Sequence, residues 1–173
     1  ERAAERPRLA PDVERVSVLL SQSIDYVRML ARSLSPVGPA PTGLPAAMHS
    51  LAARARSLGN LVVDLHLSIE AGHELSPVEA DHLYWIAQEA VTNAIRHAAA
   101  QRLDLSLEVS RSGFALRVSD DGRGTEALEA TASQAGLGLR LMAHRARGLG
   151  ANFTVTPRAS GGTLVTCFRD GRS

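Results

Sequence analysis

The sequence contains one cysteine, few aromatic side chains and no excess of either charge, and each shortage excludes a class of protein. Cys167 alone cannot form an internal disulfide, which excludes the small disulfide-stabilised scaffolds. Aromatic residues make up 3% of the chain, and nineteen basic against eighteen acidic residues give a net charge of +1. Without stacking platforms or a concentrated basic surface, we expect no binding to nucleic acid.

Long hydrophobic runs are also missing. No stretch approaches the roughly 20 apolar residues of a transmembrane helix, and the N-terminus lacks the apolar core of a signal peptide. We therefore expect a soluble chain without membrane contact of its own. The chain starts at Glu1 rather than at a methionine and soon enters helical sequence, so we interpret it as a piece of a longer protein.

Apolar periodicity predicts a separate helix at the N-terminus. Between Pro11 and Leu34, apolar residues recur every three or four positions, which is the pattern of an amphipathic helix. Residues 36–43 are rich in proline and glycine and predict a linker. We therefore divide the chain into an N-terminal helix within residues 1–35, a linker at 36–43 and a folded domain at 44–173.

The folded domain alternates helical and strand patterns. Ser76-Pro77-Val78-Glu79 carries the residues of a helix capping box. The predicted order of helix, strand, helix, strand, strand, helix, strand, strand indicates an α+β fold, a two-layer α/β sandwich with a mixed sheet and helices on one face. Helices are predicted over about 44–58, 77–99 and 137–149, and strands over 61–69, 103–109, 114–118, 152–156 and 163–168.

A polar stripe marks the helix after Ser76. Glu89, Asn93 and His97 are spaced four apart and so lie on one side of a helix whose other side is apolar. Asparagine is a poor residue for a helix interior, and a glutamate near an apolar face is costly to bury without a partner. Taken alone, however, the stripe also fits an ordinary solvent-exposed face.

Three glycine-containing segments follow this helix. Asp120-Asp121-Gly122-Arg123-Gly124 directly follows a predicted strand, where a carboxylate can accept a hydrogen bond from an exocyclic amine. Gly136-Leu137-Gly138-Leu139 opens a helix whose free N–H groups suit phosphate. Gly161-Gly162-Thr163 enters the last strand. Each segment alone is explained by a simple turn.

In this order and spacing, the four segments resemble the nucleotide-binding motifs of the sensor histidine kinase catalytic domain. Residues 89–97 resemble the N box, 120–124 the first glycine box, 136–139 the second glycine box and 161–163 the final glycine motif. That domain belongs to the ATPase superfamily shared with gyrase, Hsp90 and MutL. The resemblance covers roughly residues 44–170 and implies a Bergerat-type ATP-binding fold.

The resemblance implies that Mg2+ and the phosphates of ATP are bound by the N box. Asn93 would supply an oxygen to Mg2+, which takes its other ligands from water and the nucleotide phosphates. Glu89 would be the catalytic residue and orient a water or the incoming histidine. Arg96 and His97 would face the phosphates.

The glycine motifs are implied to hold the rest of the nucleotide. Asp120 would accept the adenine amino group, helped by Thr163 through a water. Residues 125–135 would form a short mobile lid. The remaining predicted cofactor-binding residues come from the two glycine boxes: Gly122, Gly124, Gly136, Leu137, Gly138 and Leu139.

Two further stretches, Leu83–Ala90 and Gly138–Ala146, resemble the subfamily paired with response regulators that carry a LuxR-type DNA-binding domain. The implied activity is transfer of the γ-phosphoryl group of ATP to a histidine outside this chain, for relay to such a regulator. The helix from Val13 to Leu34 looks like the second helix of the dimerisation and phosphoacceptor domain. A homodimeric full-length protein is implied, cytoplasmic or the cytoplasmic part of a membrane-anchored kinase.

The sequence departs from the family pattern in several places. Thr125 stands where a phenylalanine is common, and His144 stands where an acidic residue is common. None of the six histidines lies in the Glu-x-His-Asp context of a phosphoacceptor, so we expect no autophosphorylation of this chain in cis.

Two alternative functions stay open. One is a nucleotide-sensing module without phosphoryl transfer, and the other is an anti-sigma or switch-type serine kinase of the same superfamily. The two subfamily-like stretches count against the serine kinase.

Overall fold

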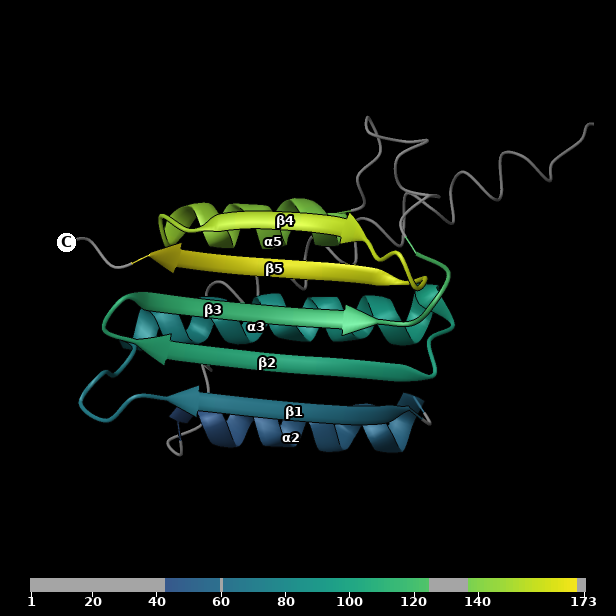
Figure 1. Cartoon of the computed structure of the whole chain (residues 1–173), viewed down its shortest axis with the longest axis horizontal. Coiled ribbons are helices and arrows are strands. Elements are labelled where there is room, and N and C mark those ends of the chain that lie inside the picture. The colour runs from purple at the N-terminus through teal and green to yellow at the C-terminus, as the bar shows by residue number, and fades with distance from the viewer. Residues whose placement is uncertain (1–42, 60, 125–136, 171–173) are drawn as a thin grey trace, which may run out of the picture. The chain divides into compact units, whose positions relative to one another are not determined.

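The computed structural model describes residues 43–59, 61–124 and 137–170 (Figure 1). The predicted N-terminal helix, most of the predicted linker and the predicted lid lie outside these residues, although Gly43, which we assigned to the linker, is the first residue of a helix. The elements follow the predicted order: α2 (Gly43–Gly59), β1 (Val62–Ile69), α3 (Pro77–Asn93), η1 (Ala94–Ala98), β2 (Arg102–Ser110), β3 (Gly113–Asp120), α5 (Leu137–Gly148), β4 (Asn152–Pro157) and β5 (Thr163–Asp170).

The strands form one five-stranded sheet in the order β1-β2-β3-β5-β4. β1 and β2 run parallel, and α3 is the crossover that parallel neighbours require. The other three pairings are antiparallel, with β2 and β3 joined by a tight hairpin. The prediction of a mixed sheet is therefore confirmed.

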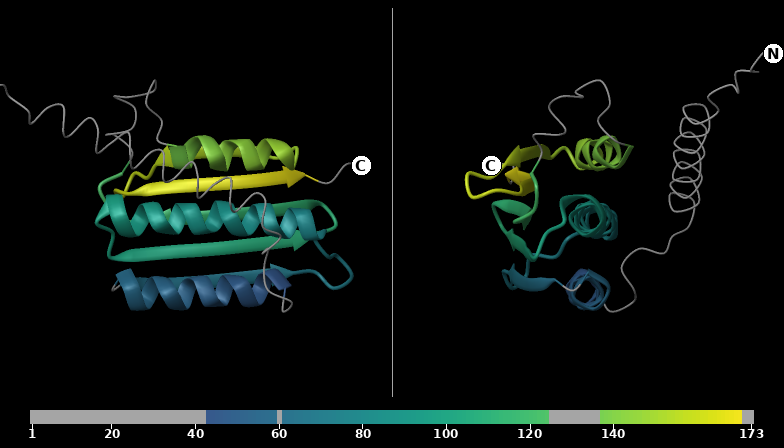
Figure 2. Two further views of the ribbon diagram at one scale, coloured as in Figure 1. Left: turned by 180° about the vertical axis from the view of Figure 1, so that it is seen from behind. Right: turned by 90° about the vertical axis from the view of Figure 1, so that its right-hand side faces the viewer.

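The helices α2, α3 and α5 cover one face of the sheet (Figure 2). The alternating apolar residues of β2 point to that face, and Leu103, Leu105 and Leu107 are fully buried there. Cys167 on β5 lies in the same core, where burial raises the pKa of its thiol to about 11. The predicted two-layer sandwich is confirmed. Among the described residues, no helix has the length and apolar character to span a membrane.

The capping box predicted for α3 is present. The N–H of Glu79 donates to Ser76 Oγ at 3.3 Å, and the Glu79 carboxylate accepts the N–H of Ser76 at 2.8 Å. The same carboxylate pairs with Arg169 at the end of β5. Burial opposes the charged form of Glu79, but the bonds from Ser76 and Arg169 outweigh it and lower the pKa of this carboxyl. The two reciprocal hydrogen bonds between Ser76 and Glu79 therefore fix where α3 starts.

The C-terminal end of α3 differs from the prediction. We expected one regular helix to about residue 99, but the α-helix ends at Asn93 and continues as the π-helical turn η1. Ala99, the residue directly after η1, has φ +50°, a left-handed conformation that is uncommon for alanine. A wide turn of this kind changes the direction in which the following residues leave the helix, and such turns are frequent at functional sites.

Candidate functional site

The start of α5 lies directly against α3. Gly138 is in the first turn of α5, and a Cβ added there would overlap the Oε1 atom of Glu89. A residue with any side chain would have to displace that carboxylate, so glycine is what allows the close approach. Gly138 and Glu89, 49 positions apart in the chain, thus bring the second glycine box into contact with the N box.

The first glycine box lies against the end of η1. A Cβ on Gly122 would overlap both the carbonyl oxygen and the Cβ of Ala98. The N–H of Arg123 donates to that same carbonyl at 2.9 Å. The π-helical turn therefore presents a main-chain acceptor to the glycine box, and this contact was not predicted from the sequence.

The final glycine motif closes on the end of β3. Gly162 is buried and has φ +90°, and a Cβ at this position would overlap the main-chain oxygen of Asp120. Gly124 approaches the same turn, since a Cβ on it would lie 3.2 Å from the Gly162 carbonyl oxygen. The first and last glycine motifs are therefore packed backbone to backbone.

Asp120 sits at the centre of these contacts and is the only polar or charged residue among the buried residues described, at 8% exposed. Its Oδ1 atom accepts the N–H of Gly122 at 2.9 Å, and its main-chain oxygen accepts Nη1 of Arg158 at 2.9 Å. A carboxylate this buried at a strand end is costly unless it is hydrogen-bonded. These contacts hold the main-chain oxygen of Asp120 and one of its two carboxylate oxygens in place.

Asp121 ties the same segment to β2. Its Oδ1 atom accepts the N–H groups of Arg102 and Gln101, at 2.8 Å and 2.7 Å. These two bonds, the one from Arg102 contributing most, hold the pKa of the Asp121 carboxyl below its ordinary value, and the nearby charge of Arg158 adds a smaller effect. The segment is therefore anchored on the side away from β5 as well.

The other predicted N-box residues are placed as follows. Asn93 is half-buried and lies one helical turn beyond Glu89, at the end of α3. Arg96 is exposed and borders a cavity of about 170 Å³ between α2 and α3, together with Leu51, Arg54 and Gln88. The side chain of His97 lies outside the described atoms.

The remaining predicted nucleotide contacts lie at the starts of α5 and β5. Leu137 is the first residue of α5, but its side chain is outside the described atoms, as is the whole of Gly136. Leu139 packs against the core. Thr163 is half-buried, begins β5 and pairs with Pro157 of β4.

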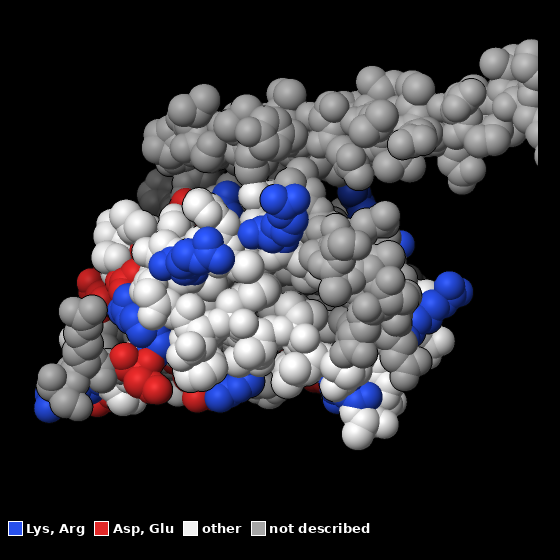
Figure 3. Space-filling model, turned by 90° about the horizontal axis from the view of Figure 1, so that it is seen from above, with Lys and Arg blue, Asp and Glu red and all other residues white. Residues whose placement is uncertain are grey.

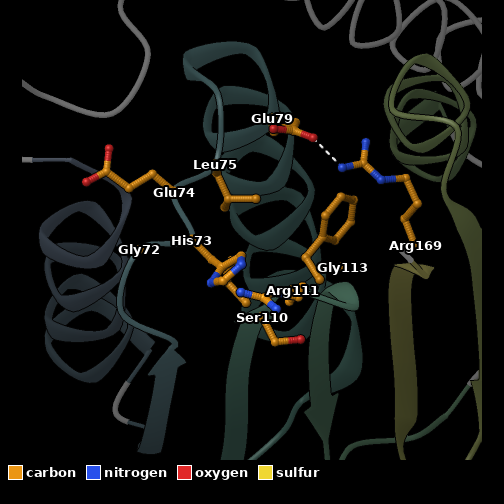
Figure 4. A pocket seen from close by; sticks show the side chains of 11 residues that line it. Gly72, His73, Glu74, Leu75, Glu79, Ser110, Arg111, Gly113 and Arg169 are labelled. Carbon is orange, nitrogen blue, oxygen red and sulfur yellow. Dashed lines mark hydrogen bonds and ion pairs between the residues drawn. The ribbon is translucent and has the colours of Figure 1, made fainter. Parts of the chain in front are cut away.

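A larger cavity, of about 250 Å³, lies at the opposite end of β3 (Figure 4). Its lining includes the hairpin residue Arg111, His73 of the β1–α3 loop, and the Glu79–Arg169 ion pair. Of the predicted nucleotide residues whose side chains the structure describes, none borders this cavity. Basic and acidic side chains are mixed on the face seen in Figure 3, which agrees with the even charge balance of the sequence.

The comparison with protein families identifies the domain. The profile of the histidine kinase-, DNA gyrase B- and HSP90-like ATPases matches residues 78–170, more than half of the chain. The chain belongs to this ATPase family. All four motifs lie in the matched range, so the contacts described above are those of an ATP-binding domain.

Related proteins place this ATPase domain among the sensor histidine kinases. The chain is 27% identical over 162 residues to the oxygen sensor histidine kinase NreB of Staphylococcus carnosus, covering 94% of this chain and 46% of that protein. It is 36% identical over 92 residues to a NarQ sensor protein homologue of Haemophilus influenzae, covering 53% and 16%. The chain thus spans less than half the length of these curated relatives.

A solved structure agrees with both the fold and the family. The ATP-binding domain of PrrB from Mycobacterium tuberculosis is 25% identical, with a TM-score of 0.60 over 76% of this chain and 96% of that domain. The prediction of a sensor histidine kinase ATP-binding catalytic domain is confirmed.

Two features of the site were missed by the sequence analysis. Arg158 lies in a turn whose other residues are small, and nothing in its spacing connects it with Asp120, 38 positions earlier. The π-helical turn is formed by an ordinary helical sequence, Ala94 to Ala98. Both depend on contacts between distant segments, for which the local pattern carries no signal.

Proposed function

We propose that this domain binds Mg-ATP beside the C-terminal end of α3 and, in its full-length protein, transfers the γ-phosphoryl group to a histidine outside this chain. The observation that carries the proposal is the contact of Gly138 with Glu89, of Gly122 with Ala98, and of Gly162 with Asp120. These contacts bring four motifs from distant parts of the sequence to one end of the sheet. Relay of the phosphoryl group to a response regulator completes the proposed function.

The proposed phosphate side is formed by α3 and α5. Asn93 and Glu89 lie one turn apart, and Glu89 contacts Gly138 in the first turn of α5. The main-chain N–H groups of a first helical turn have no partner within the helix and suit an anion. Mg2+ would neutralise phosphate charge here, with the amide oxygen of Asn93 as its protein ligand. Glu89 would orient the attacking group, and Arg96 and His97 would add positive charge.

The proposed adenine side is formed by the end of β3. Asp120 would accept the exocyclic amino group, and guanine, which presents a carbonyl at that position, would be repelled. The carboxylate is buried and already directed by Gly122, so its reorganisation on binding is small. Thr163 begins the neighbouring strand and would assist through a water.

The test uses the full-length protein incubated with ATP labelled at the γ-phosphate. We expect Mg-dependent incorporation of acid-labile label, the property of phosphohistidine, and transfer to a response regulator. Asn93→Ala should reduce labelling at least about tenfold, as expected for loss of a metal ligand that aligns a phosphoryl group. Asn152→Ala, an exposed asparagine on β4, is the matched control and should label normally.

Two results would replace the proposal by one of the alternatives. Binding of ATP by the full-length protein without incorporation of label would indicate a nucleotide-sensing module. Acid-stable label on a serine of a partner would indicate a switch-type kinase.

A further inference from the structure

The turn between β4 and β5 contributes a cation to the end of β3. Nη1 of Arg158 donates to the main-chain oxygen of Asp120 at 2.9 Å, and the side chain is half-buried in this position. The guanidinium thus binds the backbone of Asp120, whereas the carboxylate oxygen Oδ1 is bonded to the N–H of Gly122. A guanidinium bonded to the carboxylate itself would compete with any amine that the carboxylate is meant to recognise.

Arg158 is itself held in a closed turn. Its N–H donates to the carbonyl of Gly162 at 3.0 Å, and its own carbonyl accepts the N–H of Gly161 at 3.0 Å. Gly162 of the same turn packs against the carbonyl oxygen of Asp120 with no space for a side chain. The backbone of Arg158 is therefore held in place by its own turn. From there its side chain binds the main-chain oxygen of Asp120, the residue with the buried carboxylate.

We infer that Arg158 is a positioning residue of the adenine site, which selects for ATP over GTP by fixing the peptide group of Asp120. This inference rests on the proposed role of Asp120. The geometry of a hydrogen bond is sensitive to displacements of a few tenths of an ångström. A carboxylate on a less restrained peptide would hold the adenine amino group less well and would turn more readily away from a guanine carbonyl.

The experiment measures the affinities of the 173-residue chain for ATP and GTP by titration calorimetry in the presence of Mg2+. Arg158→Met removes the guanidinium but keeps an apolar stem of similar length. We expect the ratio of ATP to GTP affinity to fall by about fivefold or more, the effect of losing a charge-assisted hydrogen bond that directs the recognition group. Arg158→Lys keeps one charged donor and should recover part of the ratio.

Arg117→Met is the matched control. Arg117 is exposed on β3 and pairs with Glu108 at 2.9 Å, away from the nucleotide side of the sheet. Its replacement should leave the ratio of ATP to GTP affinity unchanged. If Arg158 had a purely structural role, its loss would weaken the binding of ATP and GTP equally. An unchanged ratio of ATP to GTP affinity in Arg158→Met therefore overturns the inference, even when the affinity for both nucleotides falls.

Asp120→Ala separates this inference from the proposed function. A parent chain that binds ATP and GTP equally, or an Asp120→Ala variant that keeps the parent preference, refutes adenine recognition by Asp120 itself. A parent preference that depends on Asp120 but not on Arg158 refutes only the positioning role. Should Arg158→Met fail to fold, Arg158→Gln, which also removes the guanidinium and has a shorter side chain, carries the same two outcomes.

Discussion

At the scale of single residues, glycine has two separable effects in this domain. Gly162 and Gly72 both have positive φ, +90° and +80°, which is costly for residues with a side chain. They differ in their surroundings, because a Cβ on Gly162 would overlap the backbone of Asp120. Apart from its own chain neighbours, no heavy atom of the described residues lies within 4 Å of a Cβ on Gly72. Substitution by alanine can therefore separate backbone strain from close packing.

We predict that Gly72→Ala lowers the free energy of unfolding by about 1–2 kcal/mol, the cost of a left-handed backbone. Gly162→Ala should lower it by about 3 kcal/mol or more, because the overlap with Asp120 adds to that cost. Urea denaturation of both variants gives the comparison. Equal losses would mean that β3 and the β4–β5 turn are less closely packed than the structure shows.

Asp121 makes the stability of the domain dependent on pH. Its pKa in the folded chain is lowered by the N–H groups of Arg102 and Gln101, so its stabilising effect is present above the unfolded value of 3.8. That effect is lost as the pH falls through the lower folded value. We predict that the parent chain loses more stability than Asp121→Asn between about pH 5 and about pH 3. Urea denaturation at both pH values tests this, and identical losses would contradict it.

At the scale of the secondary-structure elements, much of the fold could be predicted from local patterns. Alternating leucines predicted β2, and Ser76 with Glu79 predicted where α3 begins. The end of α3 could not be predicted, because Ala94 to Ala98 is ordinary helical sequence and the π-helical turn is stabilised by contacts with Gly122 and Arg123. The sheet order likewise depends on pairings between distant strands.

The cap of α3 offers a test that separates stability from nucleotide binding. We predict that Ser76→Ala costs about 1 kcal/mol of stability, because the helix loses its capping side chain. Nucleotide affinity should stay unchanged, because Asn93 lies about 24 Å away at the other end of this helix.

Ser50→Ala on α2 is the control for the loss of a serine hydroxyl. Ser50 bonds back to the carbonyl of Ala46 within the helix, and alanine is the better helix former there. Its replacement should be neutral or slightly stabilising. Thermal unfolding of both variants tests the predicted changes in stability, and ATP titration tests the predicted constant affinity. A loss of ATP affinity in Ser76→Ala would contradict the prediction and show that the cap and the site are coupled.

At the scale of the whole domain, the candidate site consists of one end of a sheet and the helix ends beside it. Its residue types were predictable because four motifs occur in a fixed order. The contacts between the motifs could not be predicted, because Gly138 contacts Glu89, and Arg158 contacts Asp120, only once the folded sheet brings these segments together. The sequence therefore predicts which residues bind the nucleotide, and the structure shows which contacts bring those residues together.

Calorimetric titration of ATP into the 173-residue chain, with Mg2+ and with the metal removed by chelation, tests the central claim most directly. We predict binding with a Kd in the micromolar to millimolar range, about −4 to −8 kcal/mol. Affinity should fall sharply without Mg2+, because the phosphates then meet Glu89 without a neutralising cation. A folded sample that binds no ATP, with or without the metal, would contradict the account of the site.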